Sequence, residues 1–248
     1  MIKISSLGSS SFGNAYIVDD GCSSILLECG MTYKKLAEKI RRTGHTVSGL
    51  SGVLISHEHK DHAKAWKQLA KDGTNIYASY GTIQALKREN ELAELIHELA
   101  IKPEEDVGQQ VRIGSFDVIP FRTFHDAAEP IGFFIRSTVS GERLLFATDT
   151  VSLAYRFQRV NLIMIEANYY EKIIAGHTKI PDTLKKRIRN THMEIDGLCR
   201  YLRMLDLSEC KACYLMHLSD SNSDEDVFYR KVKAAVPEST KVYIFDRE

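Results

Sequence analysis

The sequence predicts an α/β protein whose strands form two β-sheets within one domain, residues 1–248. Three observations support this expectation. Strand-like runs occupy the start of the chain, helical patterns dominate from about residue 63 to 97, and strand-like runs return from residue 110. No linker rich in Pro or Gly separates these regions, which favours one domain of two sheets over two domains. A chain of 248 residues is long enough to bury the hydrophobic core of one such domain.

Composition narrows the class of protein. Hydrophobic residues make up 44% and charged residues 27% of the chain, as in globular proteins. Lys plus Arg and Asp plus Glu both number 33, so the formal net charge is zero. A neutral chain is not built for long-range capture of a nucleic-acid backbone, although a local basic patch could serve. No apolar run has the length of a membrane span and no apolar signal region is present, so we expect a cytoplasmic protein without a membrane partner.

The first third of the chain alternates strands with short turns. Strands are expected over residues 3–7, 15–18 and 24–28. The Gly- and Ser-rich segment 8–14 is either a phosphate cradle or a plain hairpin connection. Thr32 is a candidate cap for a helix that runs to about Arg42. The five cysteines have no disulfide-framework spacing, and Cys210 and Cys213 of the CxxC are either a redox or zinc pair or, as we expect, reduced, buried thiols.

One stretch carries most of the chemistry. The apolar run Val53–Ile55 predicts a buried strand, and His57, His59, Asp61 and His62 follow it. Residues two apart on an extended strand point the same way, so His57 and His59 can bind one ion. Asp61 and His62 come after the strand, before a helical pattern over 63–71, and can face a second ion. Three imidazoles and a carboxylate suit zinc or a similar divalent metal.

Further candidate ligands follow later strands. His125 comes after a predicted strand at 116–123, and Asp149 after one at 143–147. Each carboxylate oxygen can take one ion, so Asp149 can bridge two metals. His217 ends a third strand-like run, 213–217. Each position alone is a weak signal, whereas their shared placement after strands makes them a consistent set.

The third quarter adds an acid, a base and a basic stretch. Glu166 ends the strand-like run 162–166, and His192 precedes an amphipathic helix at 195–205. Either His192 acts in chemistry or it only caps that helix. Segment 179–189 is rich in Lys and Arg, a pattern that fits a solvated face or a nucleic-acid contact. We also expect helices over 82–90 and 91–97.

These motifs, in this order, resemble those of the metallo-β-lactamase fold hydrolases over essentially the whole chain. Three stretches resemble the phosphodiesterase side of that superfamily, namely the YycJ-type exonucleases and, more distantly, tRNase Z and anti-Pycsar cyclic nucleotide phosphodiesterases. They are Leu7-Gly-Ser-Ser-Ser-Phe-Gly-Asn14, His125-Asp-Ala-Ala-Glu-Pro-Ile-Gly-Phe133 and Glu166-Ala-Asn-Tyr169. The resemblance implies a four-layer αββα sandwich with two mixed β-sheets flanked by helices.

The resemblance also implies roles for single residues. His57, His59 and His125 would hold the first of two divalent metals, and Asp61, His62 and His217 the second. Asp149 would bridge them, with zinc expected and manganese as the alternative. Asp61 would also orient the attacking water. His192 would assist the leaving group, with Glu166 as its orienting partner. A homodimer is expected by resemblance alone.

Four functions are compatible with this reading. The first is a phosphodiesterase for small cyclic nucleotides that act in signalling or defence, favoured by the neutral charge. The second is a nuclease for single strands or ends of DNA or RNA, favoured by the YycJ-type resemblance and the basic stretch. A glyoxalase-like thioester hydrolase would need the metals but not His192. An inactive metal-binding scaffold is the fourth. The first two imply a nucleotide or nucleic-acid partner.

Overall fold

The computed structural model describes residues 1–86 and 93–245, which pack into two compact units. The first unit contains Met1–Arg122 and Ala127–Glu142. The second contains Thr123–Asp126 and the chain from Arg143 onward. The expectation of one domain over residues 1–248 stays a prediction. Within the described ranges, no helix combines the length and the apolar character needed to cross a membrane.

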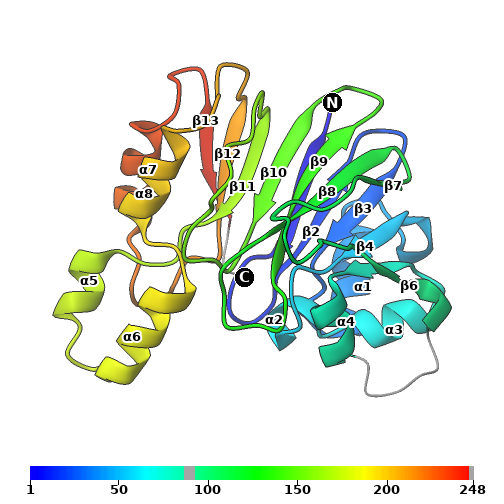
Figure 1. Cartoon of the computed structure of the whole chain (residues 1–248), viewed down its shortest axis with the longest axis horizontal. Helices are drawn as coiled ribbons and strands as arrows, with labels where there is room; N and C mark the ends of the chain where they lie inside the picture. Colours follow the sequence, from blue (N-terminus) through cyan, green and yellow to red (C-terminus); the bar gives the residue numbers. More distant parts are fainter. Residues whose placement is uncertain (87–92, 246–248) are drawn as a thin grey trace. The chain divides into compact units, whose positions relative to one another are not determined.

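The first unit contains a mixed six-stranded sheet, in the order β1-β2-β3-β4-β5-β6. Figure 1 labels β2, β3, β4 and β6 of this sheet. Strands β1, β2 and β3 pair antiparallel, whereas β3, β4, β5 and β6 pair parallel. The six strands are Lys3–Gly8, Ala15–Asp19, Ser24–Leu27, Gly52–Leu54, Ile76–Ala78 and Ile96–Glu98. The Gly- and Ser-rich segment joins the antiparallel β1 and β2, as expected for a hairpin connection.

Helices and three antiparallel strands of a second, mixed sheet complete the first unit. Its helices are α1 (Tyr33–Arg42), α2 (Lys60–Ala63), α3 (Trp66–Lys71) and α4 (Tyr80–Leu86), with 3₁₀ turns at Val47–Gly49 and Ala93–Leu95. Strands β7 (Val111–Ile113), β8 (Phe116–Arg122) and β9 (Ile131–Ser137) pair antiparallel in that order. The helix predicted from Thr32 to Arg42 is confirmed, because Leu36 and Ile40 recur at i and i+4 and lie buried in the core.

The chain between residues 82 and 97 departs in part from the helices expected there. The helix expected over 82–90 is present as far as Leu86, and residues 87–92 lie outside the described part of the chain. The helix expected over 91–97 is wrong where it is described. A 3₁₀ turn there leads into the edge strand β6, Ile96–Glu98. Parallel pairing with β5 outweighs the helical propensity of Glu94 and Leu95.

The second unit contains four parallel strands in the order β13-β12-β11-β10 (Figure 1). They are Arg143–Ala147 (β10), Leu162–Glu166 (β11), Ala212–Met216 (β12) and Lys241–Ile244 (β13). All five residues of β11 are buried, as expected for a parallel strand that is covered on both faces. Because β10, β11 and β12 are parallel neighbours in register, the residues that follow them meet at one edge of the sheet.

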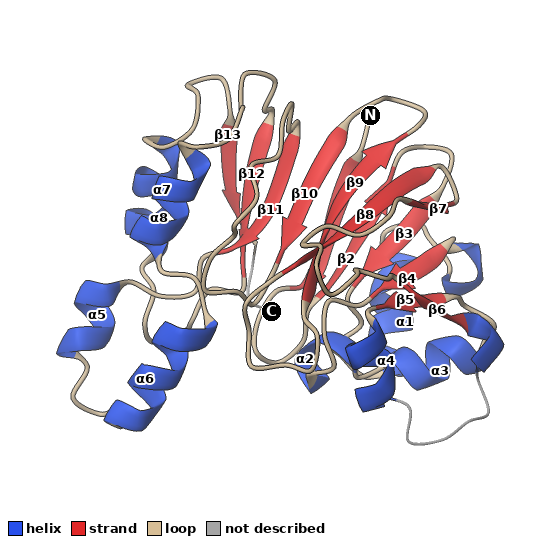
Figure 2. Cartoon of the chain, viewed as in Figure 1, coloured by secondary structure: helices blue, strands red, loops and turns tan. Residues whose placement is uncertain are grey.

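The described residues of the second unit form the helices α5 (Glu171–Gly176), α6 (Asp182–Thr191), α7 (Ile195–Leu202) and α8 (Glu225–Lys233). Helices α7 and α8 pack against each other, and α8 packs on β13 (Figure 2). The expected helix at 195–205 is therefore confirmed, with its end at Leu202. The CxxC cysteines Cys210 and Cys213 are buried free thiols.

Candidate active site

A buried carboxylate organises the candidate site of the second unit. Glu166, the last residue of β11, is fully buried. Its Oε2 accepts hydrogen bonds from the backbone N–H groups of Thr150 at 2.9 Å and Met193 at 3.1 Å. Its Oε1 lies 2.5 Å from Nδ1 of His192 and 3.3 Å from Nδ1 of His217. One carboxylate thus fixes the rotation of two imidazoles.

Burial disfavours ionisation of Glu166, but the adjacent His192 and His217 outweigh it and lower the pKa of this carboxyl group. Glu166 is therefore an anion that accepts a hydrogen bond from Nδ1–H of His192 and leaves Nε2 of that ring for other partners. Burial likewise opposes a positive charge on His192, yet Glu166 raises the pKa of His192 above its ordinary 6.5. A pKa raised in this direction favours the charged ring, which is consistent with the proton-donor role expected from the sequence.

His192 does not cap the helix that follows it. The cap of α7 is Glu194, whose carboxylate accepts a hydrogen bond from the backbone N–H of Gly197 at 2.9 Å. His192 lies between the end of α6 and that cap. Its ring borders a cavity of about 400 Å³. The capping alternative left open by the sequence is thereby removed.

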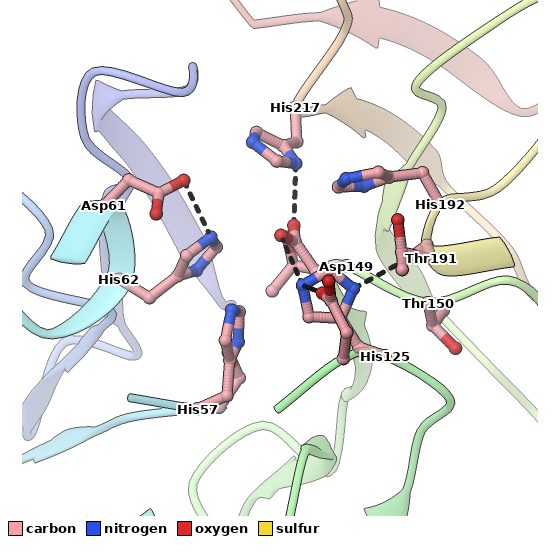
Figure 3. Close-up of polar contacts among 12 residues, drawn as sticks. His57, Asp61, His62, His125, Asp149, Thr150, Thr191, His192 and His217 are labelled. Atoms are coloured by element: carbon pink, nitrogen blue, oxygen red, sulfur yellow. Dashed lines mark hydrogen bonds and ion pairs between the residues drawn. The ribbon is translucent and has the colours of Figure 1, made fainter. Parts of the chain in front are cut away.

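Asp149 and His217 form a second close pair at the same sheet edge (Figure 3). Asp149 follows β10 and His217 follows β12, and Nδ1 of His217 lies 2.6 Å from Oδ1 of Asp149. Burial opposes charge on His217, but Asp149 and Glu166 raise its pKa to about 10. Both residues have left-handed backbone, with φ of 33° for Asp149 and 54° for His217. Such conformations in non-glycine residues gather at functional sites.

His125 faces the same carboxylate. Its Nδ1–H donates to the backbone carbonyl of Thr191 at 2.7 Å, which leaves Nε2 directed at acidic side chains (Figure 3). That Nε2 lies 3.1 Å from Asp126 and 3.5 Å from Asp149. Burial lowers the pKa of His125, and a neutral ring with Nδ1–H held by a carbonyl is the form that binds metals through Nε2.

The donor chemistry of the second unit fits a divalent metal. Asp149, Glu166, His192 and His217 each offer one atom within a group whose atoms all lie within 4.8 Å of one another. Imidazole nitrogens with carboxylate oxygens are the donors that zinc binds in catalytic sites. Glu166 already has both oxygens committed to amides and histidines, so it serves this group better as an orienting residue than as a ligand. His192 holds its Nδ1–H on Glu166 and serves as the candidate proton donor, which leaves Asp149 and His217 as the candidate ligands of this group.

The first unit carries the central histidine motif. Strand β4 ends at Leu54 and α2 begins at Lys60, so His57 and His59 occupy the connection between them. They therefore follow the strand, as expected. The expected start of the helix at residue 63 is wrong, because Asp61 and His62 belong to the first turn of α2. The rings nevertheless gather as expected. His57 lies 4.7 Å from His59 and 4.2 Å from His62 between ring centroids.

A second buried carboxylate, Glu28, supports this motif, and sequence reasoning missed it. Glu28 follows β3, is fully buried and has a φ of 62°. It accepts a hydrogen bond from the backbone N–H of Ser56 at 3.1 Å, and its Oε2 lies 3.5 Å from Nδ1 of His62. Its place next to one motif histidine mirrors that of Glu166. The available signal was an acidic residue directly after an apolar strand.

The segment 8–14 and Gly30 fix the motif backbone. Asn14 donates to the carbonyl of Asp61 through its backbone N–H at 2.8 Å and through its side chain at 3.2 Å, and its Nδ2 lies 3.2 Å from Nε2 of His62. A Cβ on Gly30 would lie 1.6 Å from the carbonyl oxygen of Asp61, so only glycine fits there. These contacts support the hairpin reading of the segment.

The basic stretch lies on α6, where acids neutralise several of its charges. Arg189 donates to both oxygens of Glu171, at 2.9 and 2.6 Å. Arg187 donates to Asp126 at 2.8 Å, and Lys185 lies 3.5 Å from Asp182. A helix face neutralised in this way is a poor continuous track for a phosphate backbone.

Comparison with known proteins decides the family. A model described as "Beta-lactamase superfamily domain" matches residues 23–218. The chain belongs to this family. It is 28% identical over 233 residues to exodeoxyribonuclease WalJ of Streptococcus pneumoniae serotype 2, covering 91% of this chain and 84% of the relative. It is 27% identical over 250 residues to exodeoxyribonuclease YycJ of Bacillus anthracis, with 96% and 90% covered.

A solved structure shows the same fold. The metallo-beta-lactamase fold protein YhfI from Bacillus subtilis superposes with a TM-score of 0.72 at 18% identity, covering 99% of this chain and 97% of that one. The predicted family resemblance and the predicted fold, two mixed β-sheets flanked by helices, are therefore confirmed. The protein is a hydrolase of the metallo-β-lactamase fold.

Proposed function

We propose that the protein hydrolyses phosphodiester bonds of nucleotides with the help of two divalent metal ions. The observation that carries the proposal is the Glu166–His192 pair beside the Asp149–His217 pair. A histidine that is held protonated by a buried carboxylate, next to a metal-binding donor set, can protonate a leaving oxygen. A thioester has a leaving group that needs no such donor, so this pair favours phosphodiesters over the glyoxalase-like alternative.

The proposed ligand assignment follows the sequence. The first metal would be held by His57, His59 and His125, the second by Asp61, His62 and His217, with Asp149 as the bridge. When bound, such ions acidify a water and neutralise charge on the phosphoryl group. Asp61 would orient the attacking water. His192 would donate the proton from Nε2 to the leaving oxygen, while Glu166 holds its Nδ1–H.

Small cyclic nucleotides are our first candidate substrates. The neutral net charge, the acid-paired cations of α6 and a cavity of about 400 Å³ beside His192 all favour a compact substrate over a long strand. A nuclease is the second candidate, favoured by the two exodeoxyribonuclease relatives. Zinc is our preferred metal, with manganese as the alternative. The homodimer and the cytoplasmic location expected from the sequence stay predictions.

The proposal is tested by incubating metal-loaded protein with cyclic mononucleotides, cyclic dinucleotides, labelled single-stranded DNA and RNA, and a thioester. Chelator-treated protein, reloaded with metal in a parallel sample, is the control. We expect metal-dependent release of phosphomonoesters from at least one nucleotide substrate. Turnover of the thioester alone would refute the proposal, and the relative rates on cyclic and linear nucleotides rank its two candidates.

A further inference from the structure

The cavity beside His192 lies within the second unit. It is lined by the segment that follows Asp149, by Tyr169, by His192, Met193 and Glu194, and by residues of α7 and its end. Oε2 of Glu194 accepts a hydrogen bond from the backbone N–H of Gly197. Its volume of about 400 Å³ is near the lower end of the range for small-molecule sites. A cavity of this size suits one nucleotide and is too small for a stretch of strand.

The wall of the cavity is largely apolar and aromatic. Leu153, Met204, Tyr169 and Tyr201 are among its lining residues, and the two tyrosines are 5% and 4% exposed. The hydroxyl of Tyr201 donates to the backbone carbonyl of Tyr155 at 3.0 Å, which holds that side chain in place. Proteins bind unpaired bases on aromatic surfaces of this kind.

Arg200 lines this cavity without an acidic side chain to pair with its charge among the described residues. Arg200, on α7, lines the cavity, and among the residues that the structure describes we find no ion pair or hydrogen bond for its guanidinium. It extends over Gly197, since a Cβ on that glycine would lie 3.7 Å from Nη2 of Arg200. Arg187 and Arg189, in contrast, each donate to a carboxylate. A guanidinium with open donors matches the geometry of a phosphate group.

We propose that this cavity is the subsite for the leaving nucleotide, and that Arg200 binds a second phosphate which that nucleotide carries. The inference rests on the proposed function, in which His192 protonates the leaving oxygen. Because His192 borders the cavity, the unit that departs with this oxygen is the one that occupies it. Cyclic dinucleotides and phosphate-ended oligonucleotides carry such a second phosphate. A 3′,5′-cyclic mononucleotide has a single phosphate, the one attacked, and leaves Arg200 without a ligand.

The test compares three linear substrates: dithymidine with a 5′-terminal phosphate, with a 3′-terminal phosphate, and with neither. We expect one phosphorylated isomer to be hydrolysed with a kcat/KM roughly 10- to 100-fold above that of the unphosphorylated dinucleotide, the range for hydrogen bonds to a charged group. Arg200→Gln should abolish this preference. Arg203→Gln, an exposed arginine of the same helix end that does not line the cavity, should keep it.

Equilibrium binding separates failure of the subsite from failure of the proposed function. Thymidine 5′- and 3′-monophosphates are titrated against wild type and both variants, with thymidine as the reference. Tighter binding of a monophosphate than of thymidine, lost in Arg200→Gln only, supports the subsite even when no phosphodiester is hydrolysed. Hydrolysis of all three dinucleotides at equal rates, or equal loss in Arg200→Gln and Arg203→Gln, overturns the subsite and leaves the proposed function standing.

Discussion

Replacement of His192 by alanine tests the chemistry proposed for the second unit. The variant removes the imidazole whose Nδ1 lies 2.5 Å from Glu166, and Glu166 keeps its two backbone amides and His217 as partners. The site should therefore keep its arrangement and lose only the proton donor. A general acid contributes roughly 10²–10⁴-fold in rate, or about 2.7–5.4 kcal/mol of activation free energy.

The leaving group provides the internal control. A nucleoside hydroxyl needs a proton as it departs, whereas nitrophenolate leaves without one. Rates on a nucleotide substrate should thus fall by the full factor, and rates on a nitrophenyl phosphodiester much less. His177→Ala, a half-buried histidine at the end of α5, is the matched control and should leave both rates unchanged. Equal losses on both substrates, or loss of bound metal from His192→Ala, would refute the donor role.

The pH profile gives an independent readout. Glu166 raises the pKa of His192, so the donor is charged below that raised pKa and is lost as the pH rises through it. The wild-type rate on a nucleotide substrate should consequently fall on the alkaline side. In His192→Ala this alkaline fall should disappear, and its persistence would assign the titration to another group.

Three further predictions concern other parts of the site. Gently purified protein should contain about two metals per chain by elemental analysis. Asp149→Ala should lower the occupancy of both metal sites, because a bridging carboxylate binds both ions. A variant that keeps one ion fully bound would contradict the bridging role. Lys185→Ala with Lys186→Ala should leave turnover within a few-fold, whereas a large loss with a flatter salt dependence would indicate a nucleic-acid track. Gly30→Ala should weaken metal retention and lower Tm, since its Cβ would overlap the Asp61 carbonyl oxygen. Gly176→Ala is the control and should resemble wild type, because its Cβ would meet nothing within 4 Å.

The positions of the chemistry could be predicted from the sequence because each candidate residue follows an apolar run. Asp149, Glu166 and His217 come after β10, β11 and β12 or end them, and these runs are recognisable without any partner. Because β10, β11 and β12 are parallel neighbours, they bring these three side chains to one edge of the sheet. The metal roles of these residues stay predictions, whereas their mutual contacts are observed in the structure.

Local sequence patterns did not predict the structure where strand pairing or exposure of charged side chains to solvent decides the secondary structure. Helix α6 was read only as a basic stretch, because its charged side chains hide the helical period. Strand β6 was read as helix, because its pairing with β5 is not encoded within the segment itself. Glu28 was passed over for a related reason. Its role depends on the parallel pairing of β3 with β4, which brings Ser56 and His62 to it.

Backbone conformation and hydrogen bonding support the same role for Glu28 and Glu166, namely to hold a neighbouring histidine. In the described part of the chain four non-glycine residues have left-handed φ, and three of them, Glu28, Asp149 and His217, are site residues at strand ends. Such conformations cost free energy, as does burial of a carboxylate, and neither would persist without compensation. Backbone amides and imidazoles supply it: Ser56 and His62 for Glu28, and two amides with two histidines for Glu166. In each unit the fold therefore holds a buried carboxyl group against a histidine before any ligand arrives, which is the preorganisation that metal binding and proton donation require.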